Sequence, residues 1–307
     1  MNPFRHASVI VTDEVSDALH EGRGVVALET TIVVQGLPSP INLDVAAACD
    51  HAVRESGSVP ATVGVLDGEL VVGMDAAQLA RLADPERASA KLSARDLGVA
   101  LSLARDGATT VAGTIAAAAR VGIDVMATGG LGGVHRDAVT SFDESADLAS
   151  LARTSVLVVA SGVKSILDIA ATLERLDSLG VPVVGYQTND FPGFYLHASG
   201  HAIEWSVTTP KEAGAAFRAH REFATSGMLL ANPVALDRQL DPQLHETALS
   251  GAFETARRQG VTGKAVTPVL LAEFARLTGG ASVEVNRDLV VANARLAGHV
   301  AAAIAAS

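Results

Sequence analysis

Glu29 and Lys164 are the two residues whose side chains are best placed in the sequence for proton transfer and nucleophilic attack. Lys164 follows the valine-rich run 155–160 and Ser161-Gly162, so we expect it where a buried strand passes into an amphipathic helix. Glu29 directly follows the apolar run 25–28. Ligands of open α/β sheets bind outside the carboxyl ends of the strands. Both positions are therefore candidates for chemistry.

Each of these residues also has a simpler interpretation. Lys164 could be an exposed lysine at the start of a helix, and Glu29 could be a helix-capping or solvated glutamate. The composition bears on the lysine, because only four of the 23 basic residues are lysines. A neutral lysine is a nucleophile and an arginine is not. A lysine near a pocket in this arginine-rich chain therefore indicates a need for an amine.

The segment 141–147, SFDESAD, brings three acids together. Asp143 and Asp147 are four residues apart, so on a helix they could share a face and hold a hard divalent cation through few ligands and several waters. Acids also favour first helical turns without any metal. Both interpretations remain open at this point.

Two segments have the composition of an anion site. The run 128–136, TGGLGGVHR, has four glycines within five residues, so its backbone amides could approach an anion, but it lacks the spacing of a Walker loop or a dinucleotide fingerprint. The run 91–96, KLSARD, could gather a phosphate near a helix start, or could be a solvated loop.

The elements that must position these residues alternate along the chain. Apolar runs predict strands at 25–28, 108–112, 125–128, 155–160, 183–186 and 228–231, and Asp67-Gly68 predicts a β-hairpin. Helical patterns lie between them, with Asn42 and Asn286 as expected helix starts. The sequence thus predicts an α/β fold, a three-layer α/β/α arrangement with a central mixed, largely parallel sheet and a hairpin excursion. The loop 187–195 could form a lid or a wall, or could pack over the sheet.

Composition excludes several classes of protein. We expect one domain over residues 1–307, because nothing resembling a linker divides the chain. The net charge of −11 argues against wide contact with nucleic acid. The sequence shows no leader and no uninterrupted membrane-spanning run, so we expect a cytoplasmic protein without membrane contact. The single Cys49 excludes an intrachain disulfide and is expected in the core.

Nine segments resemble, in order and over nearly the whole chain, those of the pseudouridine-5′-phosphate glycosidases, also called the indigoidine synthase A family. They are ALETTIVVQGLPSP, SGSVPATVGVLDGELVVGM, KLSARDL, GATTVAGT, TGGLGGVHR, SADL, ASGVKSILDIAATLE, YQTNDFPGFY and NRDLVVANARLAG. Nine segments in one order are far more specific than any single motif of this chain.

The resemblance implies an enzyme that reversibly cleaves the carbon–carbon glycosidic bond of pseudouridine 5′-phosphate to uracil and ribose 5-phosphate. It implies Lys164 as the covalent nucleophile, Glu29 as the proton donor and Asp143 as the ligand of a divalent metal, typically Mn²⁺. It further implies a homotrimer, with the glycine loop expected to hold the phosphate. The implied substrate contacts are Lys91, Val111, Thr128, His135, Ser145, Ala146 and Asp147.

These residue types suit that chemistry. Lys164 would attack C1′ as the sugar ring opens, and Glu29 would protonate carbon 5 of uracil before water releases ribose 5-phosphate. Lys164 must then be neutral and Glu29 protonated, and burial is the expected cause, because it disfavours the charged form of each. The chain departs from the family pattern at Gln35, at Thr30-Thr31 and over 200–210, which puts base selectivity or trimer contacts in question.

Two other functions compatible with the sequence belong to different classes. A Schiff-base lyase or aldolase acting on another sugar phosphate would keep Lys164 and the phosphate site but would use Glu29 differently. A non-catalytic sugar-phosphate-binding protein would bind without turnover, and a Lys164→Ala variant would bind nearly as well as the wild type.

Overall fold

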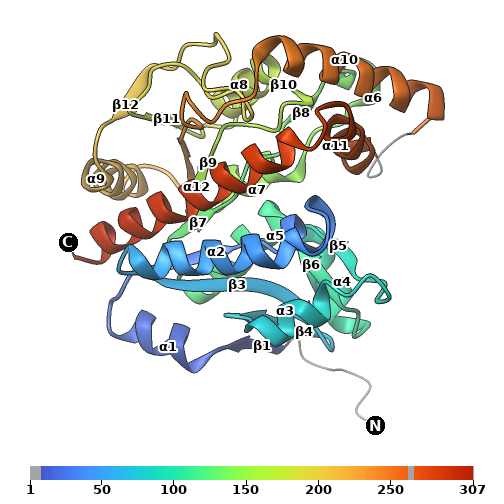
Figure 1. Cartoon of the computed structure of the whole chain (residues 1–307). Coiled ribbons are helices and arrows are strands. Elements are labelled where there is room, and N and C mark those ends of the chain that lie inside the picture. Colours follow the sequence, from blue (N-terminus) through green and yellow to red (C-terminus); the bar gives the residue numbers. More distant parts are fainter. Residues whose placement is uncertain (1–7, 262–265, 307) are drawn as a thin grey trace.

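Four neighbouring parallel strands form the centre of the protein, whose computed structural model describes residues 8–261 and 266–306 (Figure 1). All their residues are buried, as expected for apolar runs covered on both faces. The strands, in spatial order, are β2 (Val25–Leu28), β7 (Val125–Ala127), β9 (Leu157–Ala160) and β13 (Met228–Ala231).

The remaining strands extend this sheet on both sides into a mixed sheet of 11 strands with the order β1-β4-β3-β2-β7-β9-β13-β11-β12 and with β6 and β5 joined to β3. Their bounds are β1 (Ser8–Val11), β3 (Val59–Leu66), β4 (Glu69–Val72), β5 (Ala90–Leu92), β6 (Gly107–Thr109), β11 (Val183–Tyr186) and β12 (Trp205–Val207). The hairpin predicted at Asp67-Gly68 is confirmed, because β3 and β4 pair antiparallel around it. A separate two-stranded sheet pairs β8 (Val134–His135) with β10 (Leu167–Asp168).

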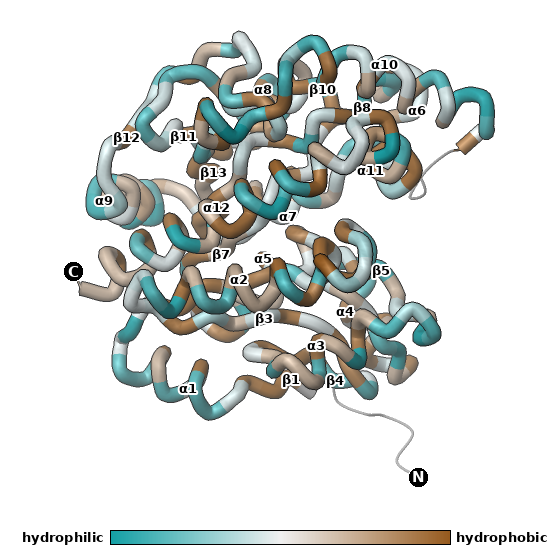
Figure 2. Tube along the Cα trace, viewed as in Figure 1, coloured by the Kyte–Doolittle hydropathy of each residue, from teal (hydrophilic) through white to brown (hydrophobic). Residues whose placement is uncertain are grey.

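Helices cover both faces of the sheet, which confirms the predicted three-layer α/β arrangement. On one face α2, α12 and α9 pack side by side, and on the other α4, α5, α7 and α8 follow one another (Figure 1). Hydrophobic residues concentrate in the strands and on the inner sides of these helices (Figure 2). The helix bounds are α1 (Asp13–His20), η1 (Ile32–Gly36), α2 (Ile41–Glu55), α3 (Ala76–Leu82), α4 (Ala94–Ser102), α5 (Val111–Val121), α6 (Ala138–Ser141), α7 (Ala146–Arg153), α8 (Ile169–Ser178), α9 (Pro210–Arg221), α10 (Pro242–Gln259), α11 (Val266–Leu277) and α12 (Ala281–Ala305).

The long final helix, α12, crosses three of the four central strands. Its length and apolar composition would be enough to span a membrane, but half of its most apolar window is buried inside the protein, as in the core helix of a soluble protein. The approach to the sheet is close at Gly24, where an added Cβ would lie 2.6 Å from the backbone of Ala301. Any larger residue at position 24 would therefore push α12 away from the sheet.

Several local predictions are wrong in instructive ways. Asn42 does not cap α2; the helix starts after Pro40, and the Asn42 side chain donates 2.8 Å to the carbonyl of Val33. Asn286 does not begin the last helix, which starts at Ala281. In both places the asparagine is a buried residue inside the helix and not its first residue. The interpretation of the chain as a single domain stays a prediction.

Candidate active site

The carboxyl ends of β2, β7 and β9 lie next to one another and place the candidate catalytic residues at one edge of the sheet. Leu28 is paired with Ala127, and Ala127 with Val159. Glu29 and Thr128, which follow the first two strands directly, therefore come together although they are 99 residues apart in the chain. Parallel pairing in this register thus gathers the groups that the sequence had placed only at separate strand ends.

Glu29 is 7% exposed, and two threonine hydroxyls hold its carboxyl group. Thr128 donates to Oε1 and Thr31 donates to Oε2. The neighbouring Thr30 turns away and donates to the carbonyl of Val63 at 2.8 Å. Glu29 is thus neither solvated nor a helix cap. Its carboxyl group is fixed at the end of β2.

Lys164 lies in the loop that joins β9 to β10. The prediction of a helix directly after Gly162 is wrong, since α8 begins only at Ile169. The Lys164 amide donates 3.1 Å to the carbonyl of Leu131, and Leu167 pairs with His135 across the small sheet, so the loop is held at both of its ends. The lysine side chain is partly buried and forms no ion pair within residues 8–261 and 266–306.

A cavity of about 250 Å³ opens at this edge of the sheet, and Glu29 and Lys164 both line it. It brings together every residue proposed from the sequence for the site. The others are Lys91, Val111, Thr128, His135, Asp143, Ser145, Ala146 and Asp147. The geometry thus makes one site of residues spread over more than a hundred positions, and the role of each within it stays a proposal.

The backbone of the glycine loop, residues 129–133, packs closely against other segments and does not form an open anion-binding loop. The amide of Leu131 donates to the carbonyl of Gly162 at 3.0 Å, and that of Gly132 to Asp147 at 2.9 Å. Gly130 lies under Phe194, whose ring would be 2.6 Å from an added Cβ. These glycines allow the loop to pack closely, and its engaged amides are not available to a phosphate.

Asp147 and Asp143 do not share a helical face, because α7 begins only at Ala146, with Ser145 as its cap. The Asp147 carboxylate is 5% exposed and accepts bonds from the amides of Ala112 and Gly132, both at 2.9 Å. Asp147 therefore joins the start of α5 to the glycine loop, and its oxygens are occupied by the protein itself.

Asp143 has the properties that a metal ligand at the cavity wall requires. Its carboxylate is 37% exposed, and its nearest basic partner is the His135 ring at 3.9 Å. The described residues contain no cluster of three or more His, Cys, Asp or Glu side chains that could hold a metal. Manganese accepts carboxylate, water and phosphate oxygens. Asp143 is therefore suited to a metal ion whose other ligands are water molecules and a bound substrate. It is not suited to a metal ion that protein side chains alone enclose.

The starts of α5 and α7 form a positive wall of the cavity. Val111 is the first residue of α5 and Ala146 the first of α7, and the first amides of a helix have no acceptor within the helix. Lys91, on β5, lines the same cavity. The amide of Ala112, the second residue of α5, donates to the Asp147 carboxylate, so the groups of this wall that suit an anion are the amides of Val111 and Ala146 and the ammonium group of Lys91.

Several cavity residues were not expected from the sequence. Thr31 holds Glu29, Phe194 covers Gly130, and Asn286 reaches the cavity from α12. The hydroxyls beside Glu29 were visible in the sequence, but which of the two threonines would face the acid was not. The segment 187–195 mainly packs in the core, with Tyr195 stacked on Phe274 at 5.1 Å between ring centres. The cavity residues supplied by α11 are Thr267, Pro268 and Leu271.

Comparison with known proteins identifies the family of this chain. The family model described as indigoidine synthase A like protein matches residues 14–303. The chain is 56% identical over 295 residues to the pseudouridine-5′-phosphate glycosidase of Salinispora tropica, covering 95% of this chain and 91% of the relative. It is 51% identical over 308 residues to the protein of the same name from Streptomyces griseus, covering 99% and 95%.

Two solved structures share the fold over almost the full length. The prealnumycin C-glycosynthase AlnA, in complex with ribulose 5-phosphate, superimposes with a TM-score of 0.90 at 37% identity and covers 98% of each chain. An indigoidine synthase A-like protein from Thermotoga maritima superimposes with a TM-score of 0.88 at 31% identity and covers 97% of each. By sequence and by structure, this chain belongs to the indigoidine synthase A like protein family.

Proposed function

We propose that the protein reversibly cleaves the carbon–carbon glycosidic bond of pseudouridine 5′-phosphate to give uracil and ribose 5-phosphate. The observation that carries the proposal is the pair formed by Glu29 and Lys164, a carboxyl group held by two hydroxyls and an amine without an ion pair among the described residues, which line one cavity. The departing atom of this substrate is a carbon, which must receive a proton as the bond breaks, so an acid alone or a nucleophile alone would not suffice.

The first step uses Lys164. Its neutral amine attacks C1′, the bond from Nζ to C1′ forms and the bond from C1′ to O4′ breaks. The proton released by the amine passes to O4′, so the sugar opens without a net change of charge. The reaction requires the neutral form of this amine, because only the neutral amine has the lone pair that attacks.

The second step uses Glu29. The lone pair on Nζ forms a double bond to C1′, the bond from C1′ to carbon 5 breaks, and that carbon takes the proton of Glu29. Water then adds to C1′ of the iminium, ribose 5-phosphate leaves as the aldehyde, and Glu29 recovers its proton. The two hydroxyls that hold Glu29 suit both of its states, because a hydroxyl can donate to the carboxylate or accept from the acid.

The phosphate of the substrate is placed, in this proposal, at the wall formed by Lys91 and the starts of α5 and α7, where Val111, Ser145 and Ala146 lie. Asp143 would hold a divalent metal, with Mn²⁺ as the expected ion, which would neutralise phosphate charge when bound. His135, 3.9 Å from Asp143, would orient that carboxylate. Asp147 and Thr128 act through other residues, the first by holding the glycine loop and the second by holding Glu29.

Incubation with pseudouridine 5′-phosphate and Mn²⁺ tests the proposal. We expect free uracil and, by mass spectrometry, a covalent sugar-phosphate adduct on the peptide that contains Lys164. The Lys164→Ala variant should form neither product while it still binds the substrate. A metal-loaded wild-type protein that forms the adduct with ribose 5-phosphate but releases no uracil would instead favour a Schiff-base lyase or aldolase. Binding without an adduct would favour a sugar-phosphate-binding protein.

The assembly and the location of the protein are also proposals. We propose a homotrimer in the cytoplasm. Val139 and Phe142, on and directly after α6, are 91% and 87% exposed and close in sequence to the cavity residue Asp143, so they are the apolar side chains that we propose for the subunit contact. Light scattering coupled to size-exclusion chromatography should give about three times the chain mass, and a monomer mass would contradict the trimer.

A further inference from the structure

A polar residue directly follows each of the four central strands, at the carboxyl edge of the sheet. These residues are Glu29 after β2, Thr128 after β7, Ser161 after β9 and Asn232 after β13. The hydrogen bonds between neighbouring strands continue past the strand ends. The amide of Thr128 donates to the carbonyl of Val159 at 3.0 Å, and the amide of Asn232 donates to β9 at 2.9 Å. The four residues therefore lie side by side, in the spatial order of their strands.

The side chain of Asn293, a fully buried residue of α12, joins three of these four residues. Its Nδ2 donates to the carbonyl of Thr128 at 2.8 Å and lies 3.1 Å from the hydroxyl of Ser161. Its Oδ1 accepts from Nδ2 of Asn232 at 2.9 Å. Because the hydroxyl of Thr128 holds Glu29, hydrogen bonds connect Asn293 to the acid through a single intervening residue.

The neighbours of the Asn293 amide allow it only one orientation. Nδ2 faces two backbone carbonyls, that of Thr128 at 2.8 Å and that of Gly129 at 3.3 Å. Oδ1 faces the amide nitrogen of Asn232, which can only donate. A rotated amide would set an oxygen against both carbonyls and a nitrogen against a nitrogen, and buried polar groups would lose their partners. The donor of Asn293 is therefore held toward Thr128.

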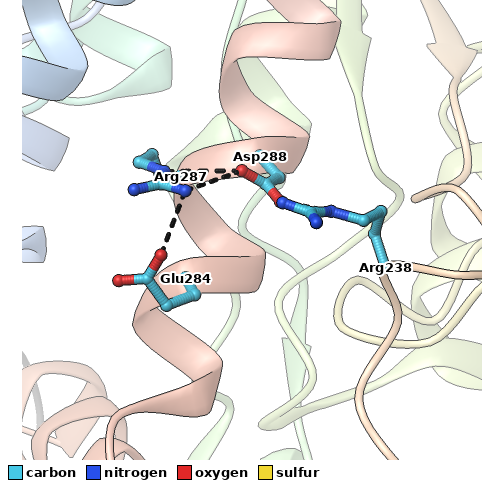
Figure 3. A network of polar contacts seen from close by, with 4 residues as sticks. All are labelled: Arg238, Glu284, Arg287 and Asp288. Carbon is cyan, nitrogen blue, oxygen red and sulfur yellow. Dashed lines mark hydrogen bonds and ion pairs between the residues drawn. The ribbon is translucent and has the colours of Figure 1, made fainter.

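The segment that follows β13, residues 232–238, holds α12 in place for this contact. Asn232, at its start, donates to Asn293, and Arg238, at its end, donates to Asp288 at 2.8 Å (Figure 3). Arg287 lies 3.4 Å from the same Asp288 carboxylate and closes the network on the outer side of the helix (Figure 3). One segment thus contacts α12 at two points along its length and fixes the helix over the strand ends.

The backbone of Thr128 determines where its hydroxyl points. A β-branched side chain has few rotamers, so a backbone that is held at both its amide and its carbonyl also sets the direction of the hydroxyl. A misplacement of about 1 Å in a catalytic site can lower the rate about 100-fold. Asn293 is not among the residues that line the cavity, so any effect that it has on the reaction must pass through residues that do.

We infer that Asn293 is a positioning residue, which holds Thr128 and through it keeps Glu29 in the orientation that proton transfer requires. This inference rests on the proposed function, in which Glu29 protonates the departing carbon. Asn293 reaches the acid from α12, the helix that crosses the central strands, and Asn232 fixes its amide from the neighbouring strand end. The orientation of the acid therefore depends on a helix that begins more than 250 residues after it in the chain.

Asn293→Asp tests the contact with Thr128. The substitution keeps the size of the side chain and the oxygen that accepts from Asn232, and in alkaline buffer, where the new carboxyl group is ionised, it removes the donor. We expect kcat for uracil release from pseudouridine 5′-phosphate to fall about 10-fold, the effect of one hydrogen bond, with KM unchanged.

Ser58→Ala is the matched control. The Ser58 hydroxyl also donates to α12, to the carbonyl of Gly298 at 2.7 Å, and it is also buried. It lies directly before β3, at the amino end of the strands and away from the cavity residues. Its loss should lower the free energy of unfolding and leave kcat unchanged.

A double-mutant cycle separates positioning from stability. If Asn293 acts through the hydroxyl of Thr128, Asn293→Asp should lower kcat no further once Thr128 is replaced by valine. The two single variants should also share one altered pH profile of kcat. Losses that multiply in the double variant, or a loss of kcat accompanied by an equal rise in KM, would overturn the inference by showing a general structural role.

Asn232→Ala is a milder second variant, because Asn232 is only partly buried and the bond from Asn293 to Thr128 remains. Without the donor that orients the Asn293 amide, kcat should fall about threefold, and this loss should also vanish in the Thr128→Val background. Should Asn293→Asp fail to fold, a wild-type kcat in Asn232→Ala would overturn the inference.

Uracil release by the wild type, measured first, tests the proposed function separately. Crystal structures of the variants test the role of Asn293 without reference to any activity. The Thr128 hydroxyl should have moved away from Glu29 in Asn293→Asp and should stay in place in Ser58→Ala. An unmoved hydroxyl in Asn293→Asp would overturn the inference and leave the proposed function intact.

Discussion

The hydroxyl of Thr128 donates a hydrogen bond to Oε1 of Glu29 across two adjacent strands, β7 and β2. Thr31 donates to the other oxygen, so the carboxyl group has a single orientation at the end of its strand. The acid is therefore positioned from two directions by neutral groups. Both partners are hydroxyl groups, which can donate to a carboxylate or accept from a carboxylic acid.

Replacing Thr128 by valine should remove one of these bonds with almost no change of volume. We expect kcat to fall about 10- to 100-fold, part of the range assigned to a positioned general acid, with KM nearly unchanged. Thr128→Ser should restore most of the activity, because it keeps the hydroxyl. Steady-state kinetics over a pH series checks this. A change in KM alone, with the pH profile intact, would mean that Thr128 contacts substrate instead.

Asp143 and Asp147 should respond in opposite ways to replacement by asparagine. Asp147→Asn leaves one of two buried amides without its acceptor, so the free energy of unfolding should fall by about 1–3 kcal/mol. Asp143→Asn should change that free energy by less than about 0.5 kcal/mol but should abolish the stimulation of activity by Mn²⁺. Urea titration and metal titration after treatment with EDTA separate the two. Equal Mn²⁺ stimulation in wild type and Asp143→Asn would remove Asp143 as the ligand.

His245 should make the protein less stable in acid. Burial lowers the pKa of His245, the charge of Arg136 lowers it further, and the ring packs against Phe274 at 5.4 Å. In the unfolded chain the histidine titrates near about 6.5. As the pH falls below that value, the unfolded chain binds a proton that the native state resists, so the free energy of unfolding decreases.

The measurement compares urea unfolding of the wild type and of His245→Phe between pH 5.5 and 7.5, a range around the unfolded value of about 6.5. The wild type should lose more stability than the variant toward the acid end. Parallel curves for the two proteins would show that His245 contributes nothing to the pH dependence.

Cys49 should be inert to alkylation in the native protein. Burial raises the pKa of its thiol to about 12, so the reactive thiolate is nearly absent at neutral pH. Iodoacetamide should label Cys49 rapidly in denaturant and very slowly without it, with intact mass as the readout. Rapid labelling under native conditions would indicate that α2 opens locally.

The sequence by itself determined the central strands and the residues at their carboxyl ends. Valine-rich runs bounded by glycine or polar residues predict buried strands, and this placed Glu29 and Lys164 at strand ends before any contact was known. The Asp67-Gly68 hairpin was predictable for the same reason, because the turn depends on its own residues. These features rest on local periodicity and local backbone preference.

Only the tertiary structure decided which polar side chains face the cavity. Asp143 and Asp147 are similar in sequence, yet backbone amides from α5 and the glycine loop bury one and leave the other at the wall. Asn286 and Asn293 lie on one helical face, yet only the second has an amide oxygen with partners among the described residues. Hydrogen bonds between segments far apart in the chain make these distinctions, and local sequence patterns carry no information about such partners.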